Sequence, residues 1–321
     1  MWQKIKMWSA LATIHHGIGA GLVPYLASIL ITGSPGLPAE ILLAAVITGL
    51  QTMGGFVMNR YFDQQGDLVR YESHLKETGE IAPRTYRQFA DMKGALLTRK
   101  RRLVHPYAAL LFALALFACS LILARPLPQS AQLLVVANAV LLLPYSLIKN
   151  HLGLTSNVIV AYLNASTILF AALAIQLNHM ALWPLMLSFF AVTLAREIVK
   201  DIEDIEPDRA NGRKTRVLFM LERHGRKEAL RRLRSTYVIP LLILGAVMNT
   251  VSLIWLYRTA YWIVAAAVWG LILVSIKELL SLETIDGGTG VPQAIYKVEG
   301  VLYQVFVASL GGLLLGSIQI A

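Results

Sequence analysis

The sequence predicts an all-α, polytopic membrane protein, and three properties of its composition lead to that class. Apolar side chains make up 56% of the 321 residues, whereas charged side chains make up only 15%. The apolar residues gather in long stretches that contain almost no charged side chain. Several of these stretches approach the ~20 residues that a helix needs to cross the ~30 Å hydrocarbon core of a bilayer. A soluble globular protein is excluded by this composition.

About nine segments are apolar and long enough to span a membrane. The first follows Lys4 and Lys6 as a signal peptide would, but its apolar run is too long for one, so we expect it to be retained. Cys119 is the only cysteine, lies within an apolar segment and is expected to pack there. No linker rich in proline, glycine or serine divides the chain, so we expect a single domain over residues 1–321. The segments, in order, are 8–31, 39–58, 106–124, 131–148, 158–177, 181–197, 237–257, 260–276 and 301–320.

The distribution of positive charge predicts the orientation of these segments. With nine helices, 27 of the 29 lysines and arginines fall on one side of the membrane, and only Arg125 and Arg258 fall on the other. The positive-inside rule then places the N-terminus and two large loops, 59–105 and 196–236, in the cytoplasm and the C-terminus outside. The net charge of +10 follows from this topology and from attraction to anionic membrane lipid. We expect no nucleic-acid partner, because neither loop combines basic residues with aromatic platforms.

Acidic residues concentrate in the same two cytoplasmic segments, which hold 14 of the 19 aspartates and glutamates. In the first, Asn59, Asp63 and Asp67 recur every four residues. If the second helix continues past the membrane surface, these side chains stack on one face. Topology requires basic residues in such a loop but gives no reason for carboxylates, so this stripe needs another explanation.

A second stripe follows the sixth segment, in "REIVKDIEDIEPDRANGRKT", where Asp201, Asp204 and Asp208 also share one helical face. Like charges at this spacing weaken a helix unless a cation lies between them. Carboxylates at this density suit Mg²⁺, which also takes diphosphate oxygens and water as ligands. One stripe alone is simply interpreted as a solvated helix end, but two stripes on the same side of the membrane favour a cation site.

Basic residues near the stripes suit an anionic diphosphate, because cations neutralise charge that builds on a departing oxygen. Lys149 closes a third short cytoplasmic loop, and two interpretations of it stay open. It is either a diphosphate contact or a lysine that sets topology or snorkels to the membrane surface. The second stripe is flanked by Arg196, Lys200, Arg213 and Lys214.

These motifs carry a resemblance to a known family. Asn59-x-x-x-Asp63-x-x-x-Asp67 and "KDIEDIEPD" resemble the two aspartate-rich motifs of the UbiA superfamily of intramembrane prenyltransferases. Between them, "LPYSLIKNHLGLTSNVIVAYLNAS" is similar to a family segment with a tyrosine, a lysine four residues later and an asparagine at the start of the next helix. The second motif is especially similar to the branch that includes archaeal digeranylgeranylglyceryl phosphate synthases.

The resemblance implies helices around a central cavity that opens to lipid. There an allylic prenyl diphosphate, held by Mg²⁺, would ionise and alkylate a lipophilic acceptor. One Mg²⁺ would be held by Asn59, Asp63 and Asp67, and another by Asp204 and Asp208 with Asp201 as a helper. The diphosphate would be bound by Tyr145, Lys149, Asn157, Arg196 and Lys200.

The chain also departs from that pattern. No stretch similar to "RPxPSG" follows the first motif, and "RKRR" at 99–102 is better interpreted as a cluster that sets topology. Pro207 is expected to end or bend the helix between Asp204 and Asp208, because it lacks an N–H group.

Two histidines, His15 and His16, lie in the first apolar segment, where ionisable groups are costly and usually face a cavity or a partner. Either histidine could bind the acceptor or accept its proton. Alternatively, it could be a neutral histidine whose hydrogen bonds are satisfied by a neighbour on the helix. Because they are adjacent, the two side chains cannot both point the same way. The neighbouring Gly17-x-x-x-Gly21 and Gly312-x-x-x-Gly316 indicate close helix packing.

Other functions remain open from the sequence. A membrane terpene cyclase would use the same acidic motifs without an acceptor. A cation-dependent transporter would carry acidic residues near the membrane midplane or broken helices, whereas the acids here stop at the surface. A structural role would require neither stripe.

Overall fold

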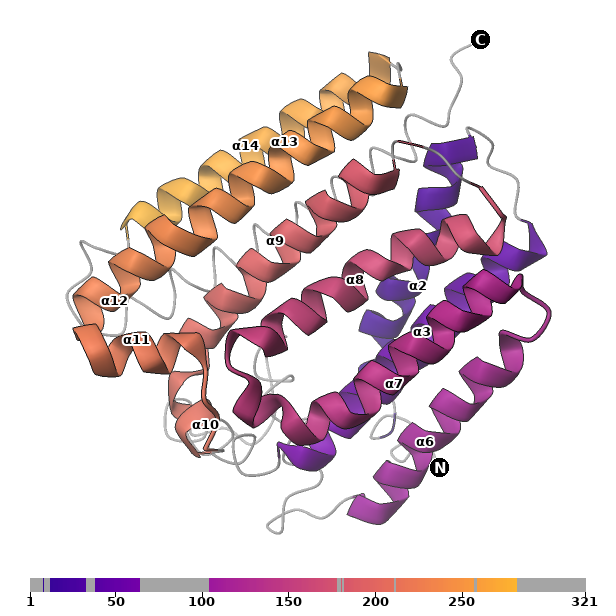
Figure 1. Cartoon of the computed structure of the whole chain (residues 1–321), viewed down its shortest axis with the longest axis horizontal. Helices are drawn as coiled ribbons and strands as arrows, with labels where there is room; N and C mark the ends of the chain where they lie inside the picture. Colours follow the sequence, from indigo (N-terminus) through magenta and orange to yellow (C-terminus); the bar gives the residue numbers. More distant parts are fainter. Residues whose placement is uncertain are drawn as a thin grey trace. The chain divides into compact units, whose positions relative to one another are not determined.

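The structure is a computed structural model that describes residues 8, 12–32, 38–63, 104–177, 180, 182–210, 212–256 and 259–281. Every secondary-structure element in these ranges is a helix (Figure 1), which confirms the all-α prediction for this part of the chain. The helices are α2 (Ile14–Thr32), α3 (Ala39–Phe62), α6 (Pro106–Leu123), α7 (Gln129–Leu152), α8 (Leu154–Ala174), α9 (Leu182–Glu203), α10 (Ile205–Ala210), α11 (Arg216–His224), α12 (Arg226–Arg232), the π-helix η1 (Leu233–Val238), α13 (Ile239–Leu256) and α14 (Thr259–Ser281).

Six helical stretches in the described residues are long and apolar enough to cross a membrane. They are α3, α6, α7, α8, α9 as far as Ile202, and the continuous stretch Arg226–Ser252. The chain is therefore an integral membrane protein. The first eight predicted segments each coincide with a helix, whereas the ninth, 301–320, lies outside the described residues, so the number nine stays a prediction.

The chain forms two compact units. The first consists of Met1–Leu22, Ala45–Leu152 and Ile205–Lys214, and the second of Val23–Ala44, Gly153–Asp204 and Thr215–Ala321. Each unit has its own apolar core. The prediction of one domain over 1–321 stays a prediction.

In the first unit, α3 packs against α6 and α7. Val57 and Met58 of α3 are buried with Ala113 and Phe117 of α6 in one core cluster. The side-chain amide of Gln51 donates a hydrogen bond to the carbonyl of Val135, 2.9 Å away, and so joins α3 to α7 inside the apolar region. A buried polar group needs such a partner, because leaving it unsatisfied away from water is costly.

Glycines bring α2 and α3 into close contact in the first unit. A Cβ atom on Gly21 would lie 2.6 Å from the carbonyl oxygen of Ala45, and one on Gly17 would lie 2.6 Å from Cγ of Met53. The predicted close packing at Gly17-x-x-x-Gly21 is thereby confirmed. The second such pair, Gly312 and Gly316, lies outside the described residues.

This contact gives a first testable prediction. Gly21→Ala is expected to lower the thermal unfolding temperature of the purified protein, because the new methyl group meets backbone rather than a flexible side chain. Overpacking of this kind costs roughly 1–3 kcal/mol. Gly19→Ala is the matched control, since a Cβ on Gly19 has no atom within 4 Å. Equal unfolding temperatures for the two variants would contradict the close approach.

In the second unit, α9 packs against α8 and α13, and α13 packs against α14. Figure 1 shows α9, α13 and α14 running side by side. The hydroxyl of Ser188 on α9 donates to the carbonyl of Gly245 on α13 at 2.7 Å. Trp269 of α14 donates its indole N–H to the hydroxyl of Thr250 at 3.0 Å. These contacts fix α9, the helix that carries the second acidic motif.

Candidate active site

The first acidic motif lies at the end of α3, against α7 in the same unit. The helix ends at Phe62, but the N–H of Asp63 still bonds to the carbonyl of Asn59 at 2.9 Å. Asn59 and Asp63 are thus one helical turn apart on one face, as their spacing predicts. From α7, Lys149 forms an ion pair with the carboxylate of Asp63, and its ammonium lies 3.4 Å from Oδ1 of Asn59. Asp67, the third residue of this motif, lies outside the described residues.

Burial excludes one of the roles considered for Lys149, that of a snorkelling side chain. A lysine that snorkels to the membrane surface keeps its ammonium in water. Lys149 is instead only 4% exposed and contacts a carboxylate and a carboxamide. Burial contradicts the snorkelling interpretation, while a role in setting topology and contact with diphosphate both stay predictions. Tyr145, 6% exposed, lies one turn earlier on the same helix.

Ser146 also contacts the first motif, although the sequence did not single it out. Its hydroxyl donates a 2.6 Å hydrogen bond to Oδ1 of Asn59. Ser146 precedes Lys149 by three residues, so both side chains lie on the face of α7 that meets Asn59. This i, i+3 spacing is the only signal in the sequence that could have identified it.

The second acidic motif begins at the end of α9. Asp201 is 4% exposed, and its Oδ2 accepts a 2.8 Å hydrogen bond from the side-chain amide of Asn157 on α8. Oδ1 of Asn157 in turn accepts a 3.0 Å bond from the hydroxyl of Ser156. Asn157 and Asp201, which the sequence analysis assigned to the site separately, are thus in direct contact. Asn157 fixes the direction in which the carboxylate points.

The helix breaks at Asp204, three residues before Pro207, rather than between Asp204 and Asp208 as predicted. α9 ends at Glu203 and α10 starts at Ile205, so Asp204 lies between the two helices. Because Pro207 has no N–H group, it cannot donate to the carbonyl of Glu203 in a continuous helix. Asp204 and Asp208 are 6% and 4% exposed, which makes both of them buried carboxylates.

The chain that follows the break binds the end of α7 in the first unit. The N–H of Lys214 donates to the carbonyl of Asn150 at 2.7 Å, next to Lys149 in the sequence. In the same segment, the Arg213 guanidinium lies 3.3 Å from the carboxylate of Asp208. Asp208 and Arg213 therefore lie close to the end of α7 that carries Lys149.

For the other residues predicted to bind the diphosphate or the acceptor, the described part of the structure shows contacts outside the two acidic motifs or none that bear on the prediction. Arg196 and Lys200 lie 3.7 Å and 4.0 Å from the carboxylate of Glu197, and the side chain of Lys214 is exposed. His16 stacks on Phe56 with the ring centroids 5.2 Å apart, which supports a packing role rather than acid–base chemistry. The side chain of His15 lies outside the described residues.

A family model for the UbiA prenyltransferase family matches residues 21–284 of the chain. The chain belongs to this family. A digeranylgeranylglyceryl phosphate synthase from Natronomonas pharaonis is 29% identical over 235 residues, which make up 73% of each protein. The enzyme of the same name from Thermococcus kodakarensis is 31% identical over 227 residues, 70% of this chain and 72% of the relative. These matches confirm the predicted resemblance and the predicted class of enzyme, a prenyltransferase.

The solved structures of this family confirm the fold. A UbiA homologue from Archaeoglobus fulgidus bound to DMAPP and Mg²⁺ superposes with a TM-score of 0.62 at 15% identity, and the alignment covers 95% of this chain and 99% of that one. Identity this low establishes the shared fold alone.

The carboxylate and carboxamide oxygens of the two motifs are ligand types that suit Mg²⁺. Among the described residues, no three acidic, histidine or cysteine side chains lie close enough together to form a metal site. The carboxylates of Asp201, Asp204 and Asp208 are nevertheless all less than 10% exposed. Buried carboxylates need positive charge nearby, and carboxylate and carboxamide oxygens are ligands that hard cations accept.

Proposed function

We propose that this UbiA family member is a Mg²⁺-dependent intramembrane prenyltransferase that moves a prenyl group from an allylic prenyl diphosphate to a lipophilic acceptor. The observation that carries the proposal is the cluster in the first unit in which the half-buried Asn59 and Asp63 contact the buried Lys149. Carboxylate and carboxamide oxygens lie there beside an ammonium group. A metal-bound diphosphate requires both kinds of group, since the metal takes oxygen ligands and the phosphate oxygens take cations.

In the proposed reaction, the bond between the allylic carbon and the diphosphate oxygen breaks, and its electron pair leaves with the diphosphate. The allylic carbon then bonds to the nucleophilic atom of the acceptor, which loses a proton. Bound Mg²⁺ would neutralise the charge that develops on the leaving oxygen. Lys149 and Arg213 would supply fixed positive charge to the same oxygens. Further contacts to the diphosphate are proposed for Tyr145, Asn157, Arg196, Lys200 and Lys214.

The proposed magnesium ligands are the oxygen-bearing side chains of the two motifs. The structure supports this role by burying the carboxylates of the second motif and by orienting Asp201 through Asn157. Ser146 contacts Asn59 and would hold its carboxamide in place. The ligands are Asn59, Asp63 and Asp67 for one ion, and Asp204 and Asp208 with Asp201 for the other.

The membrane would supply the rest of the environment. We propose nine spanning helices in a single domain, with the N-terminus and both motifs on the cytoplasmic side and the C-terminus outside. The prenyl tail would lie among apolar helices while the diphosphate stays at the polar end. Exclusion of water would protect the allylic cation from hydrolysis. Relatives named digeranylgeranylglyceryl phosphate synthase make a glyceryl phosphate lipid a reasonable acceptor to test first.

The test is incubation of the purified protein with prenyl diphosphates of several chain lengths, with or without a prenylated glyceryl phosphate or a total lipid extract. Products are identified by mass spectrometry in the presence of Mg²⁺ or a chelator. We expect a prenylated acceptor and stoichiometric diphosphate only with Mg²⁺. A cyclised hydrocarbon formed without acceptor would identify a terpene cyclase instead. Absence of Mg²⁺-dependent turnover with every pair would contradict the proposal.

A further inference from the structure

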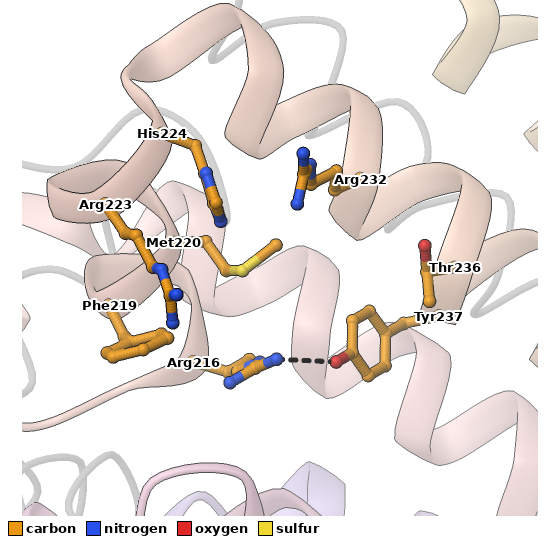
Figure 2. A pocket seen from close by; sticks show the side chains of 8 residues that line it. All are labelled: Arg216, Phe219, Met220, Arg223, His224, Arg232, Thr236 and Tyr237. Carbon is orange, nitrogen blue, oxygen red and sulfur yellow. Dashed lines mark hydrogen bonds between the residues drawn. The ribbon is translucent and has the colours of Figure 1, made fainter.

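A cationic pocket of about 410 Å³ lies in the second unit, where α11, α12 and η1 meet. Figure 2 shows its lining side chains. None of them belongs to the candidate active site described above. The pocket combines four basic side chains with two aromatic rings, namely Arg216, Arg223, His224, Arg232, Phe219 and Tyr237.

Arg216 is held in the pocket by one hydrogen bond and two aromatic rings. Its Nη2 donates a 2.8 Å hydrogen bond to the hydroxyl of Tyr237, and its guanidinium carbon lies 5.2 Å and 5.6 Å from the ring centroids of Phe219 and Tyr237. Its Nε is buried and has no hydrogen-bond partner among the described residues. The two rings therefore hold the guanidinium in place, while its Nε–H group remains available to donate a hydrogen bond.

Arg223 adds a second guanidinium on the same face of α11. It lies 6.0 Å from the ring of Phe219, so this ring has an arginine at each side along the helix. Within the described ranges, neither Arg216 nor Arg223 has a carboxylate within ion-pair distance. Glu228 instead pairs with Arg231 at 2.7 Å and with Arg232 at 2.6 Å. Arginines without a carboxylate partner are suited to an external anion, and their planar fork matches phosphate in particular.

Backbone geometry contributes a separate observation. Tyr237 belongs to η1, a π-helix that connects α12 to α13. π-Helical turns are rare and often occur at functional sites, because the wider turn changes the direction of the side chains that follow. Here the π-helix contains Tyr237, whose hydroxyl contacts Arg216 across the pocket.

The position of the pocket along the chain favours a lipid as the source of the anion. Helices α12, η1 and most of α13 form the apolar stretch Arg226–Ser252, so the pocket lies at the basic end of a candidate membrane span. The adjoining α11 buries Val217, Leu218 and Met220, whereas Phe219 is 46% exposed beside the arginines. A helix with an apolar face, basic residues and an exposed aromatic ring is typical of the membrane interface.

From these observations we propose that the pocket binds the phosphate headgroup of an anionic membrane lipid. Arg216 and Arg223 contact the phosphate, and the exposed Phe219 ring lies against the apolar part of the same lipid. A free phosphate ion would make no use of that ring. The proposal does not depend on the proposed function, because its test measures lipid binding and not turnover.

The test is native mass spectrometry of the full-length protein in a neutral detergent, titrated with phosphatidylglycerol or phosphatidylcholine. We expect phosphatidylglycerol to bind more tightly, and Arg223→Gln and Arg216→Gln each to weaken its binding about tenfold or more, because charge-assisted hydrogen bonds are lost. The side chain of Arg223 is exposed, so its replacement leaves the fold intact. Arg231→Gln is the matched control, since it removes the same charge from a side chain of α12 that does not line the pocket.

Three results would overturn the proposal. One is equal binding of the two lipids. Another is an equal loss of phosphatidylglycerol binding in Arg231→Gln, which would indicate general charge attraction. The third is displacement of phosphatidylglycerol by millimolar inorganic phosphate or by a prenyl diphosphate with the same dependence on Arg223, which would assign the pocket to a soluble anion or to the substrate.

Discussion

Replacing Asp63 by asparagine is expected to lower the rate of Mg²⁺-dependent diphosphate release at least ~100-fold, the usual scale for removing one preorganised charge interaction from a site. The carboxylate of Asp63 is a proposed metal ligand and forms an ion pair with Lys149. Asparagine keeps the shape and an acceptor oxygen for the ammonium but removes the negative charge that a divalent ion requires. The measurement is diphosphate release from an allylic prenyl diphosphate over a range of Mg²⁺ concentrations.

Asparagine is preferred to alanine because Lys149 is buried. Asp63→Ala would remove the carboxylate next to a 4% exposed ammonium group. The loss of one partner of a buried pair costs roughly 3–5 kcal/mol, and less here because the side chain of Asp63 is 24% exposed. The double variant Asp63→Ala, Lys149→Met removes both charges, so we expect it to unfold at a higher temperature than Asp63→Ala while remaining inactive.

Glu40→Gln is the matched control for Asp63→Asn, because Glu40 is an exposed carboxylate in the first turn of the same helix, α3. It is expected to retain the full rate. If Asp63→Asn also retained the full rate at every Mg²⁺ concentration, the role of the first motif would be disproved. If it failed to fold, retained turnover in the double variant would still disprove that role, and Lys149→Met alone would show how much of any loss comes from the lysine.

The sequence predicted the position of Asn59 relative to Asp63 but not the contact of these two residues with α7. The stacking of Asn59 and Asp63 is local, because a spacing of four residues in a helix fixes it. Their contact with Lys149 joins residues more than eighty positions apart, and no periodicity reports it. The sequence placed Lys149 near the diphosphate, but this direct contact was not predicted. The hydrogen bond from Ser146 to Asn59 was not expected, since a serine in an apolar helix commonly bonds to its own backbone instead.

In the region after the second motif, too, the sequence predicted local structure but not contacts between distant segments. A break close to Pro207 was predictable, because the missing N–H group of Pro207 acts on its own helix. The contact of the following segment with α7 was not predictable. The hydrogen bond from Lys214 to Asn150 joins two backbone groups, so it does not depend on which side chains the sequence carries. Arg216 was counted only as one charge of a basic loop, since its contact with Tyr237 depends on how α11 and η1 pack.

Asp204→Asn is the second substitution expected to abolish turnover, again with a fall of at least ~100-fold in diphosphate release. Asp204 is 6% exposed and lies between α9 and α10, where its N–H bonds to the carbonyl of Lys200 at 2.9 Å. The backbone bond is independent of the side chain, so asparagine leaves the helix end unchanged. The same titration with Mg²⁺ measures the effect, and circular dichroism and thermal unfolding check the fold.

Comparison with two other carboxylates separates metal binding from a general effect of charge. Glu222→Gln removes an exposed carboxylate from α11 in the same unit and is expected to leave the rate unchanged. Asp201→Asn is expected to raise the Mg²⁺ concentration needed for half-maximal rate with a smaller loss of maximal rate, because Asp201 already accepts a hydrogen bond from Asn157 and has less capacity left for a metal. If Asp204→Asn retained full activity while Asp63→Asn lost it, a single motif would suffice for the metal and diphosphate. The second motif would then serve only to pack the end of α9, and its buried carboxylates would need another explanation.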